Sequence, residues 1–281
     1  MKARNVYIGV ILLIAASWLG NGLYHQTGRL PEAGFLRHYI ETNEVPSVAF
    51  DLLYVANNDD KRKLNHVQLN EIPSLRLQPP QVHQRLRHQT IYIVRGYYDE
   101  EAIGEREAME PLRLHTVTAY YSDGSSSEED VGEIIVYREA RRSEPAKEPA
   151  IQMSFVRGSS DHSGDAAVRV LRPVEFTGVT SAWLERLGGG VEYEVRPNDS
   201  LPITDGSSIM LDQGQSFTLK YRFKPESSNI EPLSVYRLLL KMNFAEPNGE
   251  KHDYTVFANY DPYVTEAEMR AYVRERRKEH E

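Results

Sequence analysis

The sequence predicts a mainly β protein, with an N-terminal transmembrane helix, one or two immunoglobulin-like β-sandwich domains and a C-terminal α-helix. Short runs of alternating apolar and polar residues recur about every ten residues with turn residues between them, a pattern typical of sandwiches and barrels. Residues 6–19 form an uncharged apolar run behind Lys2 and Arg4, the usual signal that directs a chain to a membrane. The excess of Tyr (17) over Phe (8) favours β structure with half-exposed rings.

The N-terminal segment is interpreted as a cytoplasmic tail at residues 1–5 and a signal anchor at residues 6–24. Because a helix rises about 1.5 Å per residue, about 20 apolar residues are needed to cross the hydrocarbon core. Residues 6–19 alone are short for this, and extension to Tyr24 gives the length. The alternative is a cleaved signal peptide, with small residues at 15–17 or 20–22, and a secreted product. Either way, the bulk of the chain is expected outside the cytoplasm.

Composition limits the classes of function. The net charge of −8 and the pI near 5.7 argue against nucleic-acid binding, which needs a concentrated basic face. Hydrophobic residues (40 %) and charged residues (26 %) occur at the levels of an ordinary globular protein. The chain has no cysteine, which excludes cysteine nucleophiles, cysteine-ligated zinc and iron–sulfur clusters, and leaves packing as the source of stability.

The first half begins with a juxtamembrane segment at residues 25–45, where the spacing of Leu36, Tyr39 and Ile40 predicts a short helix. A first β domain is predicted at residues 46–140. Its clearest feature is a hairpin in which 112–121 pairs with 131–137 around Asp123 and Gly124. The other predicted strands of this domain lie at 48–54, 67–69, 75–77 and 88–98.

A charged, proline-containing stretch at residues 141–150 is interpreted as a linker. A second β-sandwich domain follows at residues 151–263, ending in a hairpin of 234–244 with 253–260; one larger sandwich spanning both halves is the alternative architecture. The helix predicted at residues 264–281 begins with a capping box formed by Thr265 and Glu268, and basic residues crowd its end.

Paired tyrosines are candidate contacts for a ligand or a partner. Because side chains alternate along a strand, Tyr97–Tyr98 and Tyr120–Tyr121 each present one ring to either face, so one ring of each pair should be partly exposed. Exposed tyrosines stack on sugars or anchor protein partners, and cross-strand packing is the simpler explanation. On the C-terminal helix, Met269 and Tyr272 form a narrow apolar stripe that would dock a partner or the protein's own sandwich.

The segment from Ser159 to Asp165 has the residue types of a hydrolase site, with Asp161, His162 and Asp165 as candidates. A catalytic triad is assembled by the fold from distant positions, and the sequence has no G-x-S-x-G elbow, so a polar connecting loop is favoured. No metal-binding motif such as H-E-x-x-H occurs. We therefore expect no catalytic, cofactor-binding or metal residues.

Three functions follow as hypotheses. The leading one is a non-enzymatic interaction or scaffold protein of the cell envelope, anchored by a single pass with its N-terminus in the cytoplasm and binding an envelope protein. The second is a cell-wall or carbohydrate-binding module. The third is an envelope hydrolase with an unfamiliar site. No motif in the sequence identifies a protein family.

Overall fold

The computed structural model describes residues 2–46, 49–103, 107–140, 149–197, 202, 208–227 and 229–280, with the side chains at 2–6, 8–10, 21, 23–25 and 49 left aside. Most of the predicted linker, residues 141–148, lies outside the described residues. The predicted mainly β architecture with several sheets is confirmed. The immunoglobulin-like topology and the domain boundaries stay predictions.

The first half contains α1, α2 and the strands β1 to β9. The bounds are α1 Lys2–Thr27, β1 Gly34–Phe35, β2 His38–Asn43, β3 Ala49–Asn57, β4 Leu64–Gln68, β5 Leu75–Leu77, β6 Gln81–Arg85, β7 Gln89–Tyr98, α2 Glu100–Ile103, β8 Met109–Tyr121 and β9 Ser126–Arg138. The predicted hairpin is confirmed as β8 and β9, joined by a shorter turn than expected because pairing already begins at Tyr120 with Ser126.

The second half contains β10 to β17 and ends with α4. The bounds are β10 Ile151–Gly158, β11 Ser163–Val170, β12 Val174–Thr180, α3 Leu184–Leu187, a 3-10 turn at Gly188–Gly190, β13 Val191–Pro197, β14 Ile209–Leu211, β15 Ser216–Phe223, β16 Val235–Ala245, β17 Lys251–Tyr260 and α4 Glu266–His280. The predicted final hairpin is confirmed as β16 and β17. The predicted C-terminal helix is confirmed as α4, and Glu268 accepts from both the backbone N–H (2.8 Å) and the hydroxyl (2.7 Å) of Thr265, as a capping box requires.

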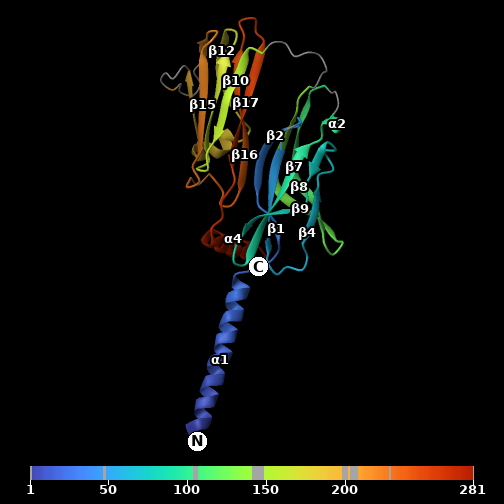
Figure 1. The fold of residues 1–281 in the computed structure, drawn as a ribbon, viewed down its shortest axis with the longest axis vertical. Coiled ribbons are helices and arrows are strands. Elements are labelled where there is room, and N and C mark those ends of the chain that lie inside the picture. The colour runs from blue at the N-terminus through green and yellow to red at the C-terminus, as the bar shows by residue number, and fades with distance from the viewer. Residues whose placement is uncertain are drawn as a thin grey trace.

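One large sheet runs through both halves, in the order β14-β12-β16-β2-β9-β8-β4, with β17 also paired to β16. A five-stranded sheet of β1, β3, β5, β6 and β7 belongs to the first half, and a four-stranded sheet, β10-β11-β15-β13, belongs to the second. Three clusters of buried side chains lie between these layers. One cluster fills each half, and the third lies around α4 at the end of the head next to α1 (Figure 1).

The strand at the centre of the large sheet replaces a predicted helix. β2 runs parallel to β9 on one side and to β16 on the other, so the helix predicted around residues 36–40 is wrong. A strand buried on both faces need not alternate apolar and polar residues, so the buried Leu36, Tyr39 and Ile40 match helical spacing over a short window. β9 can approach β2 closely because residue 132 is a glycine (φ +94°) and has no Cβ atom. A Cβ atom at this position would lie only 2.4 Å from the carbonyl oxygen of His38.

Two buried polar side chains hold β2 in place. The imidazole of His38 accepts a hydrogen bond from the backbone N–H of Leu53 (2.8 Å) and donates one to the carbonyl of Val131 (3.1 Å). The carboxylate of Glu41 accepts hydrogen bonds from the Tyr137 and Ser181 hydroxyls and from the backbone N–H groups of Ala182 and Leu239, at 2.5 to 3.0 Å. Both side chains are fully buried.

The N-terminal helix α1 extends away from the head as a separate rod (Figure 1). Among the residues that the structure describes, no helix combines the length and the apolar character needed to cross a membrane. The signal anchor at residues 6–24 therefore stays a prediction.

Candidate functional site

The paired tyrosines divide as predicted, with one ring of each pair more exposed than the other. Tyr97 is 45 % exposed and Tyr98 is 3 % exposed. Tyr120 is half-buried and stacks on the His66 ring at 4.2 Å between centroids, whereas Tyr121 is buried. Tyr97 lies on β7 in the five-stranded sheet and Tyr120 on β8 in the large sheet, so the two more exposed rings belong to different sheets.

The apolar stripe of α4 packs on the protein itself. Met269 is buried in the cluster that also contains Leu30 and Leu36, and the half-buried Tyr272 packs against the same cluster. The guanidinium of Arg277 donates to the carbonyl of Arg29 at 3.1 and 3.2 Å. These contacts place α4 beside the end of α1 and leave Met269 covered by this chain.

Of the three residues considered for a hydrolase, Asp161 and His162 lie in the turn between β10 and β11 and Asp165 lies on β11, and each is held by a different neighbour. Asp161 accepts a hydrogen bond from the Ser163 hydroxyl at 2.6 Å, which lowers the pKa of this carboxyl below its usual value. Asp165 forms an ion pair with Arg157, and the His162 ring packs on the Tyr260 ring at 4.4 Å between centroids. The structure does not align these residues as a proton relay.

An open groove of about 980 Å³ lies over the four-stranded sheet and includes Asp165. Strand register places Arg157, Asp165, Lys220 and Glu194 in one row across the four strands, so that positive and negative charges alternate. Opposite charges in neighbouring positions compensate one another. The groove therefore has no excess of charge that would select an anionic or a cationic ligand.

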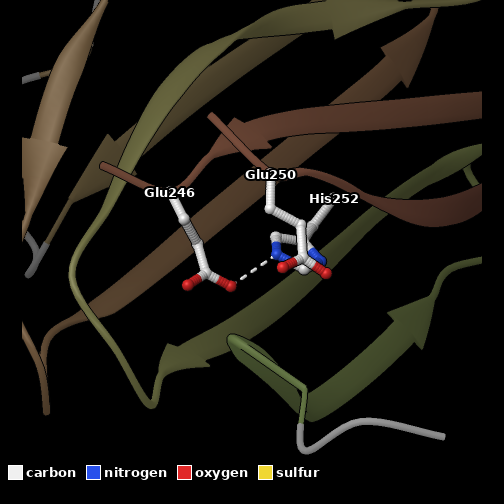
Figure 2. Close-up of side chains that lie close together, drawn as sticks. All are labelled: Glu246, Glu250 and His252. Carbon is white, nitrogen blue, oxygen red and sulfur yellow. Dashed lines mark hydrogen bonds and ion pairs between the residues drawn. The ribbon is translucent and has the colours of Figure 1, made fainter. Parts of the chain in front are cut away.

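A different constellation brings two carboxylates and an imidazole together at the tip of the β16–β17 hairpin. One possible ligand atom from each of Glu246, Glu250 and His252 lies within 4.8 Å of the other two. Figure 2 shows Glu246 on one side of the hairpin, facing Glu250 and His252 on the other. The Nε2 atom of His252 lies 2.6 Å from Oε1 of Glu246, and Arg172 pairs with the same oxygen at 3.0 Å.

The hairpin register explains why these three side chains share one face. Phe244 lies opposite His252, and the backbone N–H of Glu246 donates to the carbonyl of Glu250 at 2.8 Å. Residues two apart on a strand point to the same side. Glu246 therefore shares the inward-facing side of Phe244, and Glu250 shares the side of His252, which lies opposite Phe244. The side chains of Glu246 and His252 are 8 % and 21 % exposed, as expected at the end of a sandwich core.

Sequence reasoning missed this cluster, although part of the signal was present. A turn at residues 247–249 makes Glu246 and Glu250 neighbours, and His252 then lies on the same face as Glu250. The contribution of Arg172, which precedes β12, could not be predicted because it depends on the pairing of β12 with β16.

The comparisons with known proteins yield no family. No family model matches the chain, and no curated protein matches it. Among solved structures, a protein of unknown function from Porphyromonas gingivalis W83 has 13 % identity and a TM-score of 0.22, with 82 % of this chain and 99 % of that chain covered. The Enterococcus faecalis MSCRAMM ACE, described as binding its ligands by the collagen hug model, has 8 % identity and a TM-score of 0.25, with 83 % and 95 % covered. At these scores neither similarity carries an argument about this chain.

Proposed function

We propose that the protein is a non-enzymatic interaction module of the cell envelope, anchored by its N-terminal segment and carrying its β head outside the cytoplasm. The observation that carries the proposal is the set of large apolar side chains that α1 exposes, although α1 does not meet the combined length and apolar character of a spanning helix. Its 26 residues correspond to a length of about 39 Å. Ile11, Leu12, Leu13, Trp18 and Leu19 are each between 64 % and 78 % exposed.

Insertion into lipid accounts for these exposures. Large apolar side chains on a helix that does not pack on its own head are unfavourable in water and favourable in hydrocarbon. The basic residues Lys2 and Arg4 precede the apolar run and favour retention of the N-terminus in the cytoplasm. We infer the orientation of the head from this charge pattern.

The second part of the proposal concerns the partner, which we infer to be a protein segment in extended conformation. In the described part of the chain, β10 pairs with β11 alone, so its other edge presents backbone donors and acceptors. Met153, Phe155 and Val156 on this strand are 50 %, 39 % and 49 % exposed. An added strand would match the backbone groups and cover the apolar side chains, as in β-strand addition.

A sugar ligand fits these observations less well. Sugar binding uses the flat faces of aromatic rings, and the candidate rings at Tyr97 and Tyr120 lie on separate sheets. A glycan also lacks the regular row of N–H and C=O groups that pairs with the edge of β10.

The anchor is tested by fractionating cells that express the full chain. We expect the intact protein to stay in the membrane pellet after alkaline carbonate extraction and its head to be digested by protease added outside the cells. A variant with Leu12→Lys and Leu13→Lys should leave the pellet, whereas Met153→Lys should not. An intact soluble protein would contradict the anchor, and a shortened soluble protein would establish cleavage and secretion.

The partner is tested by placing a photocrosslinking amino acid at Val156 of the full chain in intact cells. We expect a protein adduct that disappears when Phe155→Lys is added, because the charge interrupts the apolar edge. The matched control carries the crosslinker at Met109, which is equally exposed (51 %) on β8. The same adduct from Met109, a glycan adduct or no adduct would contradict a partner at β10.

A further inference from the structure

The cluster at the tip of the β16–β17 hairpin has the chemistry of a metal centre. We propose that Glu246, Glu250 and His252 bind one divalent first-row transition metal ion, with zinc as the expected ion. The site is independent of the anchor and of the edge of β10. It lies at the end of the head away from α1 (Figure 1).

The donor set selects the class of ion. One imidazole nitrogen and two carboxylate oxygens are typical ligands of zinc and related transition metals, whereas calcium and magnesium prefer oxygen ligands alone. Three protein ligands leave the fourth tetrahedral position to water, as in open zinc sites. Arg172 pairs with one of the two carboxylates, so the two carboxylates and this guanidinium together carry a single negative charge that favours a cation.

The distances require only a small adjustment. With metal–ligand bonds of about 2.0 to 2.1 Å, two ligand atoms in a tetrahedral site lie about 3.3 Å apart. The contact between His252 and Glu246 must therefore open from 2.6 Å by about 0.7 Å. The largest separation within the cluster, at most 4.8 Å, must close by no more than about 1.5 Å. Because His252 and Glu246 are already in contact, the larger of the two adjustments falls on Glu250.

The turn beneath the cluster holds its backbone in place. The N–H of Gly249 donates to the carbonyl of Glu246 at 2.8 Å, and the N–H of Glu250 donates to the side-chain oxygen of Asn248 at 2.8 Å. Gly249 has a φ of +84°, the left-handed conformation that glycine adopts without strain. The backbone at Glu246 and Glu250, on either side of the turn, is thus held in place before an ion binds.

The test is calorimetric titration of the metal-stripped full chain in detergent with zinc chloride, and separately with calcium and magnesium chloride. We expect one zinc per chain and no heat from calcium or magnesium. His252→Gln and Glu250→Gln should each weaken zinc binding by at least about tenfold, because each removes one of three ligands. The control His280→Gln, on α4, should bind zinc like the unmodified chain.

A spectroscopic readout keeps the test independent of stability. Cobalt bound in place of zinc should give the visible absorption of a tetrahedral ion, and His252→Gln should shift or remove it. Circular dichroism of each variant shows that it is folded, and Glu250→Gln is the milder change because Glu250 lies in the turn. Absence of zinc binding to the unmodified chain would overturn the proposal. So would ligand variants that bind zinc as strongly as the unmodified chain.

Discussion

At the scale of single residues, His38 makes the stability of the head depend on pH. Burial lowers the pKa of its imidazole from about 6.5 to about 4, because the charged form would be removed from water. The unfolded chain therefore binds a proton on His38 in the range between these two values, and the folded chain does not. This contribution to stability is fully present above pH 6.5 and is lost progressively as the pH falls toward 4.

The predicted effect is a loss of about 2 kcal/mol in the free energy of unfolding between pH 7 and pH 5 from this residue alone. Urea denaturation at the two pH values measures it. In His38→Gln, the difference between the two pH values should shrink by that amount, although the variant is less stable overall. An unchanged difference in His38→Gln would contradict the assignment.

Glu41 contributes to stability through hydrogen bonds, since its buried carboxylate accepts four of them. Replacement by Ala would leave the Tyr137 and Ser181 hydroxyls and two backbone N–H groups without their acceptor. We expect Glu41→Ala to lower the free energy of unfolding by about 3 kcal/mol or more. A double-mutant cycle with Tyr137→Phe should show coupling of at least about 0.5 kcal/mol. Additive effects would show that the Tyr137 contact contributes little.

At the scale of elements, α4 stabilises the head by packing on it. The contributions of its buried face and of its N-terminal cap to the free energy of unfolding can be measured separately. Met269→Ala should cost about 2 to 5 kcal/mol because it empties a buried site in the cluster with Leu30 and Leu36. Thr265→Ala should cost about 1 kcal/mol because it removes the N-terminal cap. Thermal denaturation of both variants, beside the exposed control Arg274→Ala, measures the order. Equal small effects would contradict the docking of α4.

The elements that depend on local signals could be predicted, and those that depend on distant partners could not. The two hairpins carry their turn residues between alternating runs, and α4 carries its cap and its terminal charges. β2 carries no such signal, because its burial comes from β9 and β16, which lie about 90 and 200 residues further along the chain. The candidate site follows the same division, since Glu246, Glu250 and His252 are local to one turn and Arg172 is not.

At the scale of the whole molecule, the shared sheet predicts that both halves unfold together. β2 contributes buried residues to the core clusters of both halves, Ile40 to one and Tyr39 to the other. We expect a single calorimetric transition for the head, with equal calorimetric and van't Hoff enthalpies. Ile40→Ala should shift that single transition to lower temperature. Two separate transitions, only one of them shifted, would show that the halves are independent.

The position of β2 also has a mechanical consequence. α1 leads into the head through Leu30, whose backbone N–H and carbonyl both bond to the side chain of Asn57, then into the two-residue strand β1 and into β2. A pulling force along α1 would reach β2 once the Leu30 contacts and β1 have given way. It would then act along β2, between two parallel neighbours, and would load the hydrogen bonds of both ladders at the same time. Bonds loaded together in shear resist rupture better than bonds that open one after another. If the chain is attached at its N-terminus, this placement of β2 would oppose unravelling of the head strand by strand under tension.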